Sequence, residues 1–248
     1  MDFELSSFDQ IAFFWVGSDN KIPTFLVNSV NLVYKKKVKI FHLTNYTTRK
    51  INGTTKTIRL NLSENLMVAR LQAYKNFPYN NKLTFFCDAD SLFVQRLNLF
   101  ELPEDIYLIK RSEDFLMNHN WPEFYPEFIN KHSIEIMPYL FGGMALKDGK
   151  KFFSEILKIC FDLPQRFHRW YGDQYALKIF IEKNKPKFNL LPANTHLKIV
   201  RQIVTEKNFN VLFGDKVKMI TFKGPHTKNF INESSNNLIN FYDINKLS

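Results

Sequence analysis

The sequence lacks several features that would assign it to a common class at once. It has only 2 cysteines in 248 residues, too few for a disulfide framework, so we expect Cys87 and Cys160 to be free thiols in a reducing compartment. No apolar run approaches the roughly 20 residues that cross a bilayer, and the acidic residues near the start have the wrong charge for a signal peptide. These absences predict a cytoplasmic protein.

Familiar phosphate-binding and nucleophile motifs are also missing. The chain has no G-x-x-x-x-G-K-[ST] loop, no G-x-G-x-x-G after its first expected strand, no paired C-x-x-C and no G-x-S-x-G turn. It is therefore not expected to be a P-loop nucleotidase, a Rossmann dinucleotide-binding protein, a paired-cysteine zinc protein or an α/β-hydrolase. Any chemistry on phosphates must rest on a metal ion and on basic side chains.

The composition is that of a globular protein with an excess of basic residues. Apolar residues make up 45% of the chain and charged residues 23%, which is ordinary for a folded domain. The length favours one α/β domain. A net charge of +10 implies attraction to an anion, which can be a nucleic acid, an acidic membrane or a phosphorylated small molecule.

Short apolar runs alternate with amphipathic stretches, which is typical of βαβ units and a mostly parallel sheet. We expect strands at residues 10–17, 38–43, 57–60, 82–87, 105–110, 138–146, 187–191 and 217–222. We expect helices at residues 23–34, 63–77 and 148–160 and another after Gly172. The polar end of the chain, residues 227–248, is expected to be a loosely packed tail after one domain over residues 1–226.

Two carboxylates follow the strongest strand signal. Asp88 and Asp90 come directly after the run KLTFFC, and because side chains alternate along an extended chain they point to the same side, about 7 Å apart. The carboxyl edge of a parallel sheet is where α/β proteins bind ligands, and paired carboxylates there suit Mg²⁺ or Mn²⁺ bound with a diphosphate. The alternative is a pair of turn-forming aspartates.

Two more polar residues are expected near the same edge of the sheet. Asp19 follows the first strand at a helix entrance, and Arg70 lies on the helix that precedes the D-x-D strand. The arginine either extends its stem to solvent or directs its guanidinium across the top of the sheet at an anion.

The order of the motifs resembles nucleotide-sugar glycosyltransferases of the GT-A fold, especially those of family 8. The matching segments, in order, are Asp19, Arg70, LTFFCDADSLFVQRLNLFEL at 83–102, FGGMAL at 141–146, YGDQYAL at 171–177 and ITFKGPHTK at 220–228. The resemblance implies a single Rossmann-like α/β domain with a mostly parallel central sheet flanked by helices.

The resemblance also implies which residues bind the donor and its metal ion. Asp88 and Asp90 would hold Mn²⁺ or Mg²⁺. The family's metal-binding histidine position is Thr221 here, so His226 is the candidate third ligand. The donor would be bound by Asp19, Arg70, Asp88, Gly143, Gly224 and Lys228, with the two glycines allowing close approach.

The implied reaction breaks the bond between the anomeric carbon of a sugar and a nucleoside diphosphate. Positive groups would stabilise the negative charge that develops on the departing phosphate. Asp173 and Gln174 are the catalytic candidates. In an inverting enzyme Asp173 would deprotonate the acceptor; in a retaining one the pair would orient the sugar, and the D-Q pairing leans towards retention.

We therefore expect a hexosyltransferase that uses a nucleoside-diphosphate sugar, with a UDP-hexose favoured. Its acceptor would be a saccharide of a surface glycan or a glycolipid. The remaining lysines suit peripheral contact with an anionic membrane at its inner face.

Two other classes compete with this interpretation. A hydrophobic strand followed by D-x-D also opens the site of haloacid dehalogenase-like phosphatases, but their second acidic motif is missing after Gly172-Asp173. Lysine clusters at 35–39 and 183–187 suit a nucleic-acid-binding protein, but no zinc-finger, RNP-like or helix-turn-helix pattern accompanies them. Nucleic acid is therefore not the expected partner.

Overall fold

A computed structural model describes residues 9–97, 105–117, 125–193, 195–202, 216–224 and 231 of the 248. Its strands are β1 (Gln10–Phe14), β2 (Lys39–Thr44), β3 (Lys56–Arg59), β4 (Thr84–Asp88), β5 (Ser91–Phe93), β6 (Ile106–Lys110), β7 (Tyr139–Leu146), β8 (Asn189–Leu191), β9 (Leu197–Val200) and β10 (Met219–Phe222). Its helices are α1 (Lys21–Val33), α2 (Leu66–Lys75), the 3-10 helix η1 (Pro126–Phe128), α3 (Ser133–Ile136), α4 (Lys150–Asp162), α5 (Gln165–Arg169) and α6 (Gly172–Asn184).

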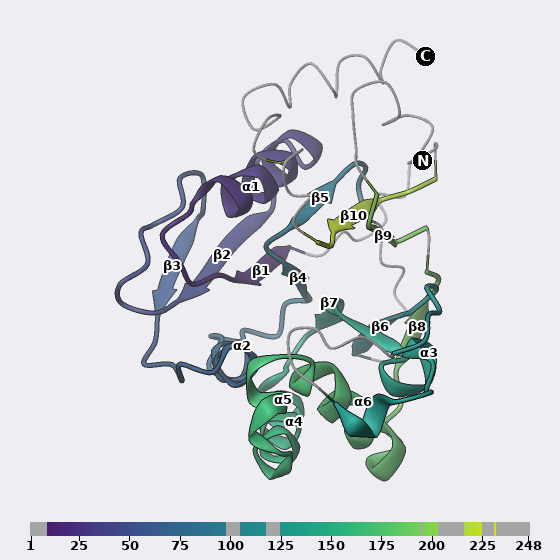
Figure 1. Cartoon of the computed structure of the whole chain (residues 1–248). Coiled ribbons are helices and arrows are strands. Elements are labelled where there is room, and N and C mark those ends of the chain that lie inside the picture. The colour runs from purple at the N-terminus through teal and green to yellow at the C-terminus, as the bar shows by residue number, and fades with distance from the viewer. Residues whose placement is uncertain are drawn as a thin grey trace.

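A seven-stranded sheet in the order β3-β2-β1-β4-β7-β6-β8 forms the centre of the fold. The pairs β1–β2, β2–β3, β1–β4 and β6–β8 are parallel, whereas β7 runs antiparallel to β4 and β6. Helix α1 lies on one side of this sheet, and α2, α4, α5 and α6 gather on the other (Figure 1). The predicted α/β fold with a mostly parallel sheet flanked by helices is confirmed.

The strands at the centre of the sheet are buried on both faces, because alternate side chains enter two different cores. On β1, Ala12 and Phe14 pack with α2, α4 and α6, while Ile11 and Phe13 pack with α1. Parallel sheets covered by helices on both faces need such continuous apolar strands. This explains why QIAFF reads as a solid apolar run after its first residue.

A second, three-stranded sheet in the order β5-β10-β9 lies beside α1. Strand β10 pairs antiparallel with β5 and parallel with β9, so it brings a late segment of the chain against the residues that follow the D-x-D motif. Ile231 is fully buried in the core between this sheet and α1. This residue, which we assigned to the loosely packed tail, therefore belongs to the folded core; the rest of 227–248 lies outside the described residues.

The short elements depart most from the sequence-based expectations. Strands β5 and β9, the 3-10 helix η1 and helices α3 and α5 were not predicted. Helix α2 begins at Leu66 rather than at 63, because the Ser63 hydroxyl accepts the backbone N–H of Asn65 and forms a turn before the helix. Cys87 and Cys160 are both free, as predicted, and the structure buries both. Among the described residues, no helix combines the length and apolar character that crossing a membrane requires.

His42 on β2 is a fully buried histidine that is held in its neutral form. Its ring stacks on Phe13 with centroids 5.0 Å apart. Its Nε2 lies 3.1 Å from the Trp15 carbonyl, which also accepts from the Thr44 hydroxyl at 2.6 Å. Burial lowers the pKa of His42 to about 4, and Arg59 adds to the decrease while the Trp15 carbonyl opposes it.

We expect His42 to lower the free energy of unfolding by about 3 kcal/mol as the pH drops from 6.5 to 4, because the unfolded histidine takes up a proton over that interval while the folded one is only about half protonated at its end. The stability that rests on neutral His42 is fully present above pH 6.5 and is lost progressively as the pH falls towards 4. His42→Phe keeps the stacked ring, and Thr44 still satisfies the Trp15 carbonyl. Urea unfolding across this pH interval should show a shallower slope for the variant; equal slopes would contradict the assignment.

Candidate active site

The two predicted carboxylates lie where the chain leaves the large sheet for the small one. Asp88 is the last residue of β4, and Asp90 immediately precedes β5. Asp88 pairs in register with Phe14, the last residue of β1, so both strands end at this edge. Their side chains are largely shielded, with 16% of Asp88 and 11% of Asp90 exposed. The sheet edge thus holds two nearly buried negative charges that need partners.

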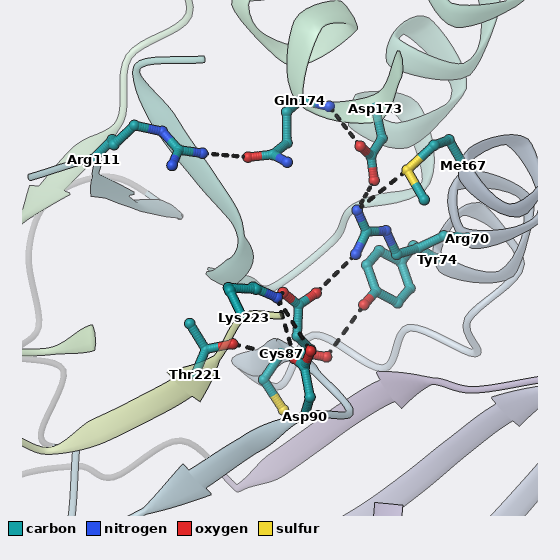
Figure 2. Close-up of polar contacts among 11 residues, drawn as sticks. Met67, Arg70, Tyr74, Cys87, Asp90, Arg111, Asp173, Gln174, Thr221 and Lys223 are labelled. Carbon is teal, nitrogen blue, oxygen red and sulfur yellow. Dashed lines mark hydrogen bonds and ion pairs between the residues drawn. The ribbon is translucent and has the colours of Figure 1, made fainter. Parts of the chain in front are cut away.

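Arg70 on α2 supplies one of those partners and connects Asp88 to the start of α6. Its Nη1 donates to Asp88 Oδ1 at 2.8 Å. Its Nη2 donates to Asp173 Oδ2 (Figure 2). The guanidinium also lies over the Phe141 ring, 4.8 Å from the centroid. Of the two interpretations of Arg70, the one in which it points across the top of the sheet is correct, and the anion it meets is a pair of the protein's own carboxylates.

Asp173 is fully buried, so its charge depends on Arg70. Burial raises the pKa of Asp173, while the charge and hydrogen bond of Arg70 oppose that increase. Burial alone would lower the pKa of Arg70, but Asp173 and Asp88 more than offset it, so the net shift is upward and the guanidinium stays charged. The triad of Asp88, Arg70 and Asp173 is a buried ion-pair network that links α2, β4 and α6.

Lys223, which sequence reasoning missed, lies between the two carboxylates of the D-x-D motif. Its Nζ donates to Asp88 Oδ2 at 2.7 Å. It also donates to Asp90 Oδ1 at 3.2 Å (Figure 2). Burial lowers the pKa of Lys223, but Asp88 and Asp90 outweigh that effect, so the net shift is upward. The sequence carried a signal for it: Lys223 is two residues after Thr221 and one residue past the end of β10, and alternation along an extended chain sends both side chains to the same side.

Thr221 on β10 stands at the position that the resemblance gives to a metal-binding histidine. Its hydroxyl donates to Asp90 Oδ1 at 3.2 Å. The side chain therefore reaches the motif, but with one neutral oxygen in place of an imidazole nitrogen. The predicted third ligand, His226, lies outside the described residues, as does Lys228 of the predicted donor site.

Gly142 on β7 is the glycine that faces the carboxylates. A Cβ at Gly142 would lie 2.3 Å from Asp88 Oδ2, so only glycine leaves room for this carboxylate. Gly143, predicted as a donor contact, faces the other side of the sheet, where a Cβ would lie 2.7 Å from Ile109. Side chains alternate along a strand, so the adjacent residues Gly142 and Gly143 face opposite sides of the sheet. Gly224 has a φ of +98°, a conformation that favours glycine.

Gln174, next to Asp173 at the start of α6, is held by a buried arginine. Arg111 Nη2 donates to Gln174 Oε1 at 2.7 Å, and Arg111 Nε donates to the Met137 carbonyl at 2.7 Å. Arg111 is only 6% exposed. An arginine has no acceptor, so the amide oxygen of Gln174 must face it and the amide N–H₂ is turned away. Asp173 and Gln174 therefore have different partners although they are adjacent.

Asp19 lies at the entrance to α1, as predicted. Its Oδ1 accepts the backbone N–H of Lys21 at 2.9 Å, which stabilises the first turn of the helix. The residue is exposed and follows Phe14, the β1 partner of Asp88, by five positions. This contact explains its place in the fold, and a role towards a nucleobase stays a prediction.

Among the described residues, the groups at the D-x-D motif that could bind a cation are two carboxylates and one hydroxyl. No group of three His, Cys, Asp or Glu side chains that could hold a metal ion occurs within the described parts of the chain. Mg²⁺ is commonly bound by one or two carboxylates together with substrate phosphates, without a complete cage of protein ligands. With all carboxylates ionised, Asp88, Asp90 and Asp173 outnumber Arg70 and Lys223 by one charge. The residues therefore fit a divalent cation that binds together with a phosphate ligand.

Comparisons with known proteins find similarity in structure alone. No family model and no curated protein matches the chain. A glycosyltransferase involved in glycosylation of the PBCV-1 major capsid aligns with a TM-score of 0.56 at 11% identity, over 90% of this chain and 97% of that one. The galactosyltransferase LgtC, solved with donor and acceptor sugar analogues, aligns with a TM-score of 0.54 at 14% identity, over 87% of each chain.

A third structure, the bifunctional glycosyltransferase WbbM, aligns with a TM-score of 0.50 at 12% identity over 96% of this chain and 51% of its own. At such low identities the similarity establishes the fold. The chain has the GT-A fold of these glycosyltransferases, as its motif order predicted, and the D-x-D motif lies at the carboxyl edge of its sheet.

Proposed function

We propose that this protein transfers a sugar from a nucleoside-diphosphate sugar, with a UDP-hexose favoured, to a saccharide of a surface glycan or glycolipid. The observation that carries the proposal is the convergence of Asp88, Asp90, Arg70 and the Asp173-Gln174 pair at one edge of a GT-A sheet. Asp88 and Asp90 would hold Mn²⁺ or Mg²⁺. When bound, that cation would neutralise negative charge on the diphosphate.

The reaction breaks the bond between the anomeric carbon and the phosphate oxygen, and the bonding electron pair leaves with the nucleoside diphosphate. The acceptor oxygen forms the new glycosidic bond. Arg70 and Lys223 are the described cations nearest the D-x-D carboxylates, and they suit stabilisation of the charge that develops on the leaving phosphate.

The surroundings of Asp173 favour the retaining outcome. A general base must reach the acceptor hydroxyl, but Asp173 is fully buried and its Oδ2 is engaged by Arg70. Asp173 therefore acts as a positioning residue that holds the guanidinium. In that arrangement the leaving phosphate takes the acceptor proton, and no protein base is required.

Gln174 would act on the sugar as a hydrogen-bond donor. Because Arg111 occupies its amide oxygen, the amide N–H₂ is the group left to meet a sugar hydroxyl. Arg111 thus fixes both the position and the polarity of this side chain.

We expect Arg111→Met to lower kcat about a hundredfold with a smaller change in the donor KM, because a misplaced orienting group costs most in the transition state. Arg96→Met is a control, since Arg96 Nε also donates to a backbone carbonyl, that of Val33 at the end of α1 opposite to Asp19. Steady-state kinetics with thermal melting separates the two roles. Equal kcat values for the two variants would refute the assignment of Arg111.

The two competing classes are less compatible with the site. The phosphatase type has a second acidic motif, which is missing after Gly172-Asp173, and the fold of the chain is that of the glycosyltransferases. The lysines at 35–37 are exposed in the turn after α1, where cations suit the negative end of a helix. They need no nucleic acid to explain them.

The proposal is tested by incubating the protein with UDP-, GDP- and CDP-linked hexoses, Mn²⁺ and a panel of oligosaccharides, and by measuring the nucleoside diphosphate released. Release with one donor, increased by an acceptor, is expected. Asp90→Asn should abolish it, whereas Asp105→Asn, which alters an exposed ion pair with Lys147, should not. No release from any donor would count against glycosyl transfer.

A further inference from the structure

Lys223 takes up the position between the carboxylates that a bridging cation would need. Its ammonium lies within 3.5 Å of three oxygens, Asp88 Oδ2 and both oxygens of Asp90. Arg70 occupies the remaining oxygen of Asp88. A divalent ion coordinated by Asp88 and Asp90 would meet the lysine charge at contact distance, and two cations so close repel each other.

The backbone at Lys223 is held by hydrogen bonds, while its side chain is a flexible stem that is partly exposed. The backbone N–H of Lys223 donates to the Val200 carbonyl at 2.9 Å, and that of Phe222 donates to the Asp90 carbonyl at 3.0 Å. The Lys223 side chain is 32% exposed, about twice as much as that of Asp88. A flexible four-carbon stem on a fixed anchor can move its charge by several ångströms without unfolding a strand.

Displacing Lys223 requires another anion to receive it. With Lys223 in place the cluster carries one net negative charge, so a divalent cation is still attracted, but a free ammonium would be left beside it. The diphosphate of a nucleotide donor is an anion of the right charge to accept that ammonium. Cation and nucleotide would then assist each other, because each removes an obstacle to the other.

We propose that Lys223 is an intramolecular counter-ion that competes with the divalent cation for Asp88 and Asp90 and moves to the donor diphosphate when the donor binds. This inference rests on the proposed function and extends it. In this proposal Lys223 determines how the cation and the nucleotide bind. The cation binds weakly alone and tightly together with a nucleoside diphosphate.

The test measures Mn²⁺ binding by calorimetry and by electron paramagnetic resonance without any nucleotide. Lys223→Met should bind Mn²⁺ about tenfold more tightly than the wild type, because the cation no longer competes with the lysine ammonium for the two carboxylates. A factor of this size corresponds to the free energy of a partly exposed ion pair. Lys223→Arg keeps the charge and should stay weak. Lys218→Met is the matched control, since Lys218 precedes β10 and contacts Gln95. Thermal melting confirms that each variant is folded.

Addition of UDP completes the test. UDP should strengthen Mn²⁺ binding to the wild type by at least about tenfold, and clearly less in Lys223→Met, whose obstacle is already gone. Unchanged Mn²⁺ affinity in Lys223→Met would overturn the competition. An equal effect of UDP on both proteins would overturn the movement to the diphosphate. Failure of UDP, GDP and CDP to bind any variant would instead count against the proposed function, and the nucleotide-free comparison would still judge the competition.

Discussion

Asp88→Asn is expected to lower sugar transfer about a thousandfold. The asparagine has nearly the size of aspartate, so it fits the space that Gly142 leaves beside it. It removes one of two carboxylates available to a cation, and it removes the shared anion that aligns Arg70 with Lys223. Donor kcat/KM is the quantity to measure.

Stability separates a chemical effect from a structural one in this variant. Arg70 keeps Asp173 as a partner and Lys223 keeps Asp90, so Asp88→Asn leaves no buried charge unpaired. We therefore expect the melting temperature of Asp88→Asn to change little. Its loss of activity then comes from the site and not from unfolding. A variant that retains more than about a tenth of wild-type kcat/KM would contradict the assignment of Asp88 to the donor site.

Arg70→Met is expected to destabilise the fold by about 3–5 kcal/mol at neutral pH, besides abolishing transfer, because it leaves Asp173 fully buried with an unpaired charge. The deficit should depend on pH. Burial raises the pKa of Asp173, and removing Arg70 removes the influence that opposes the increase. The variant should therefore be least impaired at low pH, where Asp173 is protonated, and should lose stability as the pH rises through that pKa.

A double-mutant cycle in urea checks this explanation. Asp173→Asn added to Arg70→Met should recover a large part of the lost stability at neutral pH, since no isolated charge is left in the core. The cycle should show little recovery at low pH. A pH-independent deficit, or no recovery in the double variant, would contradict the ion-pair account.

The sequence predicted the long elements because their patterns are local. Strand β4 is a continuous apolar run, and α1 and α4 have apolar residues at helical spacing. Each of these patterns can be read from a short stretch of sequence. Strand β5, with three residues, has no such pattern. It forms because β10, more than a hundred residues away in the sequence, pairs with it. No local pattern around β5 indicates this pairing.

The candidate site shows the same division. Asp88 and Asp90 were identified from one motif, and Arg70 was placed correctly because its helix precedes the motif strand. Lys223 was missed because the family motif points to Thr221 and His226 on either side of it. Only the pairing of β5 with β10 brings Lys223 to the carboxylates. Gly143 was chosen instead of Gly142 because a strand's register, which decides the facing side, cannot be read from the motif.

The excess of positive charge was a poor guide to the site. The described cations of the cluster are Arg70 and Lys223, and three carboxylates surround them. The site is therefore locally acidic in a chain of net charge +10. The two aspartates located the edge where the chemistry is proposed, and the remaining lysines suit contact with an anionic surface.

Calorimetry with UDP, GDP and CDP, with and without Mn²⁺, on the wild type and Asp90→Ala tests the central claim most directly. We predict that one nucleoside diphosphate binds the wild type, that Mn²⁺ strengthens its binding, and that Asp90→Ala loses this dependence, since Asp90 joins Lys223 and Thr221 at the site. Absence of binding by all three nucleotides under every condition would contradict a nucleotide-sugar transferase.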